Sequence, residues 1–253
     1  MKTILTITFF LSTLHSLKGQ WSPAFQVYDP NTGVYIDQWY NLWADQYGYL
    51  ISGTGGIGPK TYGIVLKSTD LINWTYVDTA RNDNRFVSLV RFDTTNVIAT
   101  TLTKVKKSFE NGKNWVLKDT IPGQGASGIY QNLVQIDSTS ALLSSTNYLY
   151  KTIDKGETWQ KVTTTDHLGW LYRRGNLIYS IRSIGTTYTI AKSVDDGNTW
   201  QYSPSVTIPF NAIHFQNKDT IYAYSVGNSN VIYRSYDGGN NFNLKDTLRL
   251  ILY

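Results

Sequence analysis

A short motif recurs five times and constrains the fold more than any other feature of this sequence. In its fullest form it reads S/T-x-D-x-G-x-x-W, as in the copy that spans 193–200. The copies begin at residues 68, 108, 152, 193 and 235, so the intervals are 40, 44, 41 and 42 residues. A period of this length indicates a repeat architecture in which each repeat is one supersecondary unit.

The residue types in the motif predict a tight turn between two strands. The hydroxyl and the carboxylate two residues later can accept hydrogen bonds from loop N–H groups, and the glycine supplies a positive φ. The final aromatic residue then opens the next strand and buries its ring against its own repeat. The first copy lacks the glycine, the second has Glu for Asp, and the last ends in Phe. We expect a structural role for Ser68, Asp70, Trp74, Ser108, Glu110, Gly112, Trp115, Thr152, Asp154, Gly156, Trp159, Ser193, Asp195, Gly197, Trp200, Ser235, Asp237, Gly239 and Phe242.

The sequence between the copies predicts four short strands per repeat. In one repeat these are 170–172, 177–181, 189–192 and the segment after the motif. The prediction is an all-β chain, a β-propeller of four-stranded antiparallel blades. Five copies favour five blades, and the apolar segment 247–253 would pair with a strand at 21–28. Six or more blades are expected instead if the chain is a truncated copy of a larger parent.

Over about residues 34 to 247 the pattern resembles the Asp-box, or bacterial neuraminidase repeat, propellers of the sialidase-like superfamily. That family includes sialidases, xyloglucan-cleaving glycosidases, sortilin-type receptors and photosystem assembly factors. The resemblance implies a propeller whose motifs lie on the outer rim, away from an axial site. It does not select one activity among the members.

The N-terminus predicts export. Residues 1–19 have a basic start, an apolar core at 3–14 and a small residue at the end, which is typical of a signal peptide. We expect residues 20–253 to form a single propeller domain that is secreted, or periplasmic or extracellular, in a bacterium. The chain has no cysteine, which excludes disulfides, thiolate metal sites and a cysteine nucleophile.

Charge gives weak evidence about partners. The formal net charge of +5 falls to +3 without Lys2 and Lys18. The basic run 104–107 alternates like a strand, so we predict a solvated strand face and no nucleic-acid partner. No segment after the leader is apolar and long enough for stable membrane insertion.

A binding site is expected at the mouth of the propeller, where the first strand of each blade begins. Aromatic and amide side chains at such positions suit a glycan or protein ligand. The candidate ligand-binding residues are Gln38, Trp39, Arg85, Tyr130, Gln131, His167 and Asn211. Alternatively, the aromatic residues of these segments pack blade against blade, which applies to Trp39, Phe86, Tyr130 and Phe210.

The catalytic set of a sialidase is missing. Both glutamates, Glu110 and Glu157, lie in the motifs, so neither can activate a tyrosine at the mouth. The arginines do not fall at equivalent blade positions. Asp37 and Asp166 are weak catalytic candidates, because a glycoside hydrolase can use two carboxylates about 5–9 Å apart.

Three other patterns are interpreted as structural, and the first two predict no cofactor and no metal. The glycine-rich segment 53–58 is followed by Pro59 and a strand, so it predicts a hairpin loop instead of a phosphate site. His167 and His214 lie in different repeats without a ligand cluster. Asn73 forms a sequon, but its place in a motif predicts a turn residue.

These observations favour a secreted, non-catalytic propeller that binds a glycan or protein at its axial mouth. The alternatives are a glycoside hydrolase with an aspartate pair and an assembly or scaffold factor that binds a peptide segment.

Overall fold

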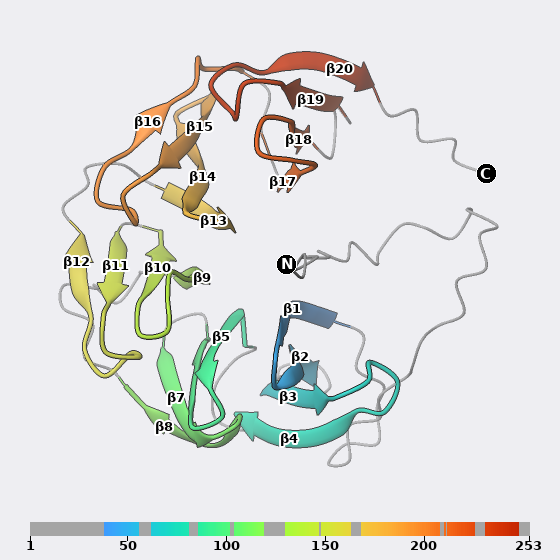
Figure 1. The fold of residues 1–253 in the computed structure, drawn as a ribbon, viewed down its shortest axis with the longest axis vertical. Coiled ribbons are helices and arrows are strands. Elements are labelled where there is room, and N and C mark those ends of the chain that lie inside the picture. The colour runs from blue at the N-terminus through green and yellow to red at the C-terminus, as the bar shows by residue number, and fades with distance from the viewer. Residues whose placement is uncertain are drawn as a thin grey trace. The chain divides into compact units, whose positions relative to one another are not determined.

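The structure is a computed structural model that describes residues 38–55, 62–80, 86–101, 104–118, 130–146, 148–162, 168–207, 210, 212–225 and 231–247. Every regular element in these ranges is a β-strand, and the strands form five four-stranded sheets (Figure 1). The predicted all-β class and the number of four-stranded blades are therefore confirmed. No helix in the described ranges is long and apolar enough to cross a membrane. The predicted leader, the strand at 21–28 and residues 248–253 lie outside the described residues.

The strands of each sheet follow one another in chain order, and neighbours are antiparallel. Sheet 1 contains β1 (Gln38–Asp45), β2 (Gly48–Gly55), β3 (Tyr62–Ser68) and β4 (Thr75–Ala80). Sheet 2 contains β5 (Ser88–Asp93), β6 (Asn96–Thr100), β7 (Val105–Glu110) and β8 (Lys113–Leu117). Sheet 3 contains β9 (Tyr130–Gln135), β10 (Ala141–Ser145), β11 (Leu149–Thr152) and β12 (Gln160–Val162).

Sheets 4 and 5 have the same order. Sheet 4 contains β13 (Leu168–Arg174), β14 (Leu177–Ile184), β15 (Thr187–Ser193) and β16 (Gln201–Tyr202). Sheet 5 contains β17 (Ala212–Phe215), β18 (Ile221–Ser225), β19 (Val231–Ser235) and β20 (Asn243–Thr247). The glycine-rich segment 53–58 begins within β2, which ends at Gly55, and the rest of the segment lies outside the described residues.

The sheets belong to two compact units. Sheets 1 and 2 lie in the unit of residues 1–120, and sheets 3 to 5 lie in the unit of residues 121–253. Within each unit the apolar core lies between successive sheets. In the first unit Leu50, Val65 and Val77 of sheet 1 pack with Phe86 and Leu89 of the second repeat. Burial of these side chains between sheets is the main stabilising contribution to such a structure.

The second unit has two clusters of the same kind. One contains residues of sheets 3 and 4, among them Leu142 and Ile178. The other contains residues of sheets 4 and 5 together with Phe210, which is 5% exposed. The interpretation that Phe86 and Phe210 pack between repeats is thus confirmed.

The motif forms the turn between the third and fourth strands of every sheet, which we call the repeat turn. In the copy at 193 the hydroxyl of Ser193 donates to the carboxylate of Asp195 at 2.8 Å. The N–H groups of Gly197 and Thr199 donate to the Ser193 hydroxyl and the Asp195 carboxylate, both at 2.9 Å. The same bonds recur in the copies at 152 and 235. The predicted hydrogen-bonded turn is therefore confirmed.

Where a copy departs from the motif, other local hydrogen bonds close the turn. In the second copy Glu110 accepts the side-chain amide of Asn114 at 2.8 Å. In the first, shortened copy the Asp70 carboxylate accepts the backbone and side-chain N–H groups of Asn73, both at 2.7 Å. This confirms that Asn73 is a turn residue.

The repeat turns of sheets 4 and 5 also contact the preceding sheet, which the sequence did not indicate. A Cβ atom on Gly197 of sheet 4 would lie 2.5 Å from Leu142 of sheet 3. A Cβ on Gly239 of sheet 5 would lie 3.1 Å from Tyr179 of sheet 4, whose hydroxyl donates to Gly238 O at 3.1 Å. The turn glycines are therefore required for close approach between sheets as well as for their positive φ.

Two predictions about basic residues are wrong. Lys107 of the run 104–107 is 1% exposed, with its ammonium 5.1 Å from the centre of the Phe109 ring, so the strand face is not solvated there. Arg91 and Arg173 also occupy equivalent positions. Arg91 pairs with Val97, which pairs with Ser108, the first residue of a motif. Arg173 pairs with Ile178, which pairs with Ser193, the first residue of another motif. Strand pairing decides the second fact, whereas Lys107 shares the buried face of Val105, which lies two residues before it.

Candidate ligand-binding site

Several of the predicted site residues lie outside the described residues, namely Asp37, Arg85, Asp166, His167 and Asn211. The backbones of the other four are described. Gln38 and Trp39 open β1, and Tyr130 and Gln131 open β9, so these four residues lie where a first strand begins, as expected. Their roles in binding stay predictions.

Three of the first strands share an irregularity at this end. The register of β1 with β2 shifts between Trp39 and Asn41, which leaves Tyr40 as an extra residue. The register of β9 with β10 shifts in the same way around Gln131. A β-bulge of this kind bends a strand and redirects a side chain, and bulges are common beside functional sites.

The third bulge lies in β13. Leu168 pairs with Arg182 and Leu171 pairs with Ser180, so Gly169 and Trp170 together oppose a single residue. The strand pairs that lead to the repeat motifs make Arg173 the counterpart of Gln135, so Trp170 is the counterpart of Asn132.

The bulge leaves the indole of Trp170 in solvent. Trp170 is 42% exposed, whereas Leu168 and Leu171 on either side of the bulge are 3% and 2% exposed. A large exposed aromatic ring at the start of a first strand is a surface on which a sugar or an apolar side chain can stack. Sequence reasoning missed Trp170 as a site residue, because only strand pairing reveals the bulge.

The buried side-chain amide of Asn132 links the bulge of β9 to the bulge of β13. The Asn132 side chain donates to Leu171 O at 2.7 Å and accepts from Leu171 N at 2.8 Å. Ser144 Oγ donates to the same amide oxygen at 3.0 Å. Asn132 directly follows Gln131, and Leu171 directly follows Trp170. The two bonds therefore bring the bulged backbone of β9 beside that of β13.

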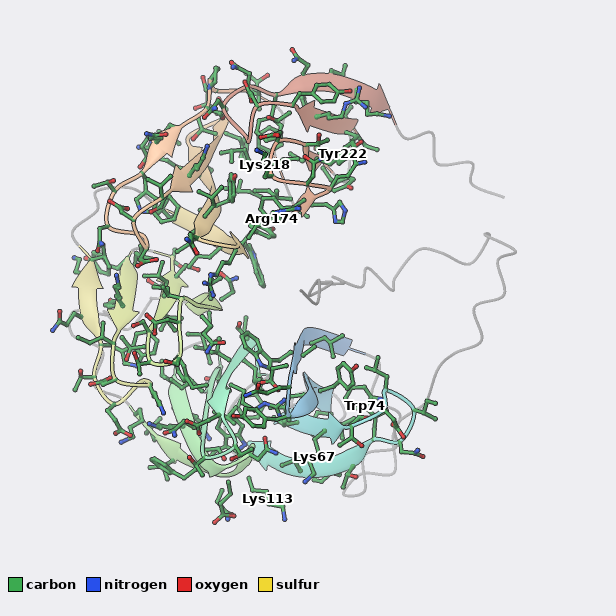
Figure 2. The ribbon with its side chains drawn as sticks, in the orientation of Figure 1. Lys67, Trp74, Lys113, Arg174, Lys218 and Tyr222 are labelled. Atoms are coloured by element: carbon green, nitrogen blue, oxygen red, sulfur yellow. The ribbon has the colours of Figure 1, made fainter. Side chains whose placement is uncertain are left out.

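On its other side β13 is anchored to sheet 5. Tyr172 is bonded to the backbone of Ile213, and burial raises the pKa of Tyr172 to about 12. The phenol therefore stays neutral at physiological pH. Arg174 ends β13 (Figure 2), and His214 of β17 is exposed to solvent. The strand that carries Trp170 is thus supported from both neighbouring sheets.

The repeat-turn carboxylates are held in the ionised form. Hydrogen bonds from the Thr199 side chain and backbone lower the pKa of Asp195 to about 2. For Asp237, burial favours the neutral form, but the bonds from Asn241 and Ser235 outweigh it and lower the pKa to about 2. A general acid of a glycosidase needs the opposite shift. These groups are turn elements.

The carboxylates of Asp45 and Asp137 also have structural roles. The Asp45 carboxylate is paired with Arg91, whose Nε donates to it at 2.8 Å and whose side chain is 1% exposed. Asp137 caps the first hairpin of sheet 3 by accepting Thr139 N at 2.7 Å. Among the described residues there is no group of three or more His, Cys, Asp or Glu that could hold a metal ion.

Comparisons with known proteins identify the fold. No protein-family model matches the chain, and no curated protein matches it. The GH74 enzyme of Niastella koreensis is similar at a TM-score of 0.66 and 16% identity, over 88% of this chain and 42% of that chain. YCF48 bound to D1 peptide has a TM-score of 0.50 and 12% identity, over 89% of this chain and 84% of that chain. A chain of the nidogen/laminin complex has a TM-score of 0.54 and 9% identity, over 74% of this chain and 73% of that chain.

The similar structures are β-propeller proteins, so the predicted fold class is confirmed: the chain has a propeller fold with five four-stranded blades in the part of the chain that the structure describes. The chain spans less than half the length of the GH74 enzyme. At these identities the likeness concerns the fold alone.

Proposed function

We propose that this chain is an exported propeller of the Asp-box type that binds a protein or glycan without transforming it. The observation that carries the proposal is the exposed indole of Trp170, which the bulge in β13 turns out of a buried strand. The assignment to the Asp-box propellers draws on the repeat turns, whose hydrogen bonds are the ones that the motif predicts. Export rests on the predicted leader at 1–19.

The position of Trp170 supports binding over a purely structural role. An indole that served only to pack would be buried, as Trp159 is at 3% exposure. The bonds between Asn132 and Leu171 fix the backbone beside it, so the ring is presented on a rigid element. A preorganised aromatic surface of this kind loses little conformational entropy when a ligand stacks on it.

The state of two repeat-turn carboxylates supports binding over hydrolysis. Asp195 and Asp237 have lowered pKa values, so neither is prepared to donate a proton. The alternative is a glycoside hydrolase that uses Asp37 and Asp166. Its support is the fold likeness to a GH74 enzyme.

A third candidate is an assembly or scaffold factor that binds a peptide segment. It is favoured by the fold likeness to YCF48, which is described as bound to D1 peptide. All three candidates use the same end of the first strands, and they differ in the ligand and in whether a bond is broken.

The test is binding of the full secreted chain to a glycan array and a peptide array, with wild type beside Trp170→Ala and Tyr236→Ala. Tyr236 is a matched control because it is also an exposed aromatic residue, at 60%, but lies in a repeat turn. We expect Trp170→Ala to weaken the best ligand about tenfold or more, and Tyr236→Ala to leave it unchanged. Equal binding by Trp170→Ala and wild type would refute the proposed site.

A released-sugar assay on a polysaccharide panel separates binding from hydrolysis. We expect no release by the wild type. Release that is abolished by Asp37→Asn or Asp166→Asn would instead establish the glycoside hydrolase.

A further inference from the structure

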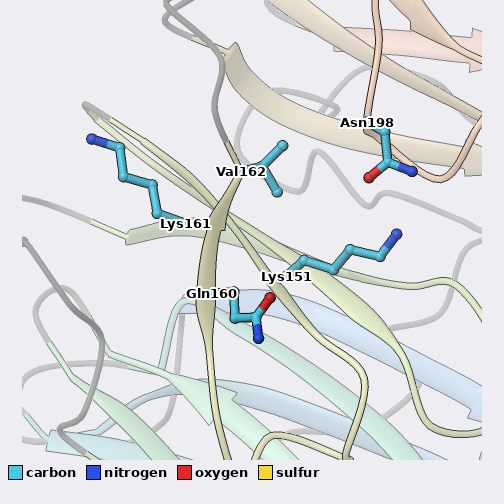
Figure 3. Close-up of a pocket in the computed structure, with 5 residues that line it drawn as sticks. All are labelled: Lys151, Gln160, Lys161, Val162 and Asn198. Atoms are coloured by element: carbon cyan, nitrogen blue, oxygen red, sulfur yellow. The ribbon is translucent and has the colours of Figure 1, made fainter.

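A small polar hollow lies in the second unit, away from Trp170 and from the first strands. It has a volume of about 260 Å³ and is lined by Lys151, Gln160, Lys161, Val162 and Asn198 (Figure 3). The first four residues belong to β11 and β12 of sheet 3, and Asn198 belongs to the repeat turn of sheet 4. The volume is below the ~300–1,000 Å³ of pockets for drug-sized ligands, so the hollow suits a single side chain.

Strand register decides which side chains face the hollow. Lys151 and Gln160 are directly paired across β11 and β12, so they lie on the same face. Val162 lies two residues after Gln160 and shares that face. Lys161 points to the opposite face, where its ammonium lies 3.3 Å from the centre of the Tyr148 ring. Figure 3 shows the Lys161 side chain directed away from Lys151 and Asn198.

The hollow combines one cation with two amides. Lys151 Nζ donates to Asp196 O at 3.2 Å, which positions the ammonium and leaves two of its three N–H groups. The Asn198 amide donates to Asp195 O at 2.6 Å and retains its second N–H. The side chains that line the hollow include no carboxylate. An ammonium and amide donors without a counter-charge suit a carboxylate ligand.

The edge of sheet 3 indicates that the carboxylate comes from a peptide. β12 is the outermost strand of its sheet, and within the described residues no strand pairs with its outer edge. Such an edge can pair with an extended peptide through main-chain hydrogen bonds, while a neighbouring pocket takes one of its side chains. Val162 adds an apolar wall for the methylene groups of that side chain.

We infer that this hollow is a subsite for the carboxylate side chain of an acidic peptide segment that lies along β12. The site is separate from the one proposed at Trp170, and neither depends on the other.

The experiment measures fluorescence anisotropy of a short fluorescein-labelled polyglutamate peptide with the full secreted chain. Gln160→Glu places a repelling carboxylate of nearly the same size at an exposed position, so the fold is retained. Lys151→Gln removes the cation. We expect each variant to weaken binding by roughly ten- to hundredfold. Trp170→Ala should bind the peptide as wild type does.

Lys192→Gln is the matched control. Lys192 directly precedes the motif of sheet 4, as Lys151 precedes that of sheet 3, and the substitution removes the same charge. An equal loss in Lys192→Gln, or no saturable binding by the wild type, would overturn the proposal. Tighter binding of an oligogalacturonate than of the peptide, sensitive to Gln160→Glu, would also overturn it in favour of a carboxylated glycan.

Discussion

Gly197 lies so close to Leu142 that a Cβ atom on the glycine would sit 2.5 Å from Leu142 Cδ1. The glycine belongs to the repeat turn of sheet 4, and the leucine is fully buried in sheet 3. The repeat turn is thus a packing element between successive sheets as well as a chain reversal. Its φ of 81° independently favours glycine.

Gly197→Ala should therefore destabilise the protein by about 2–4 kcal/mol, from the positive φ and from the overpacking of Leu142. The control is Gly175→Ala, at a φ of 58° with no atom within 4 Å of the added Cβ. It should cost only about 1–2 kcal/mol. Urea unfolding followed by tryptophan fluorescence measures both, and equal effects would show that the contact with Leu142 is unimportant.

Asp45→Ala should cost about 3–5 kcal/mol of unfolding free energy, because it leaves the buried Arg91 guanidinium without its counter-charge. Asp137→Ala is the matched control. Asp137 caps the corresponding hairpin of sheet 3, and Arg173, which is the counterpart of Arg91 in sheet 4, is exposed to solvent. We expect a loss of about 1 kcal/mol there. Similar losses in the two variants would contradict a special role for the Arg91 pair.

Asn132→Ala should cost about 2–4 kcal/mol, because it leaves the buried N–H and C=O of Leu171 without partners. Ser144→Ala removes a bond to the same amide but leaves the bonds to Leu171, so its cost should be about 1 kcal/mol. If Asn132 positions the bulges, its variant should also weaken the ligand of Trp170. Normal ligand binding by a folded Asn132→Ala protein would exclude that role.

Acid should weaken the repeat turns. The folded-state pKa values of Asp195 and Asp237 are lowered to about 2 from 3.8. Their contribution to stability is therefore complete above about pH 4, and it is lost as the pH falls towards 2. The double variant Asp195→Asn, Asp237→Asn should show a flatter decline of unfolding free energy over this range. Asp196→Asn, a change in the neighbouring exposed carboxylate, should retain the wild-type decline.

Local chemistry explains which parts of the fold could be predicted. The turn at Ser193 and Asp195 depends on residues within one segment, so its hydrogen bonds follow from the motif alone. The four strands per repeat follow from the turn residues that separate them. The blade-packing interpretation of Phe86 and Phe210 also succeeded, because large apolar rings are buried wherever the chain allows.

The predictions that failed depend on the two faces of a strand and on strand pairing. Lys107 lies two residues after Val105 in β7, so both side chains lie on one face, and both are buried. Arg91 and Arg173 are equivalent only when the register is known. The exposure of Trp170 could not be anticipated, because only strand pairing reveals the bulge in β13.

The sequence by itself determined the repeat, its period and the chemistry of each turn, since those interactions join residues close along the chain. The tertiary structure decided how the turns contact the preceding sheets, as Gly197 contacts Leu142. It also decided which aromatic ring at the start of a first strand is left in solvent. Both depend on contacts between residues far apart in the sequence. A shift of one residue in strand register reverses the side from which a side chain projects.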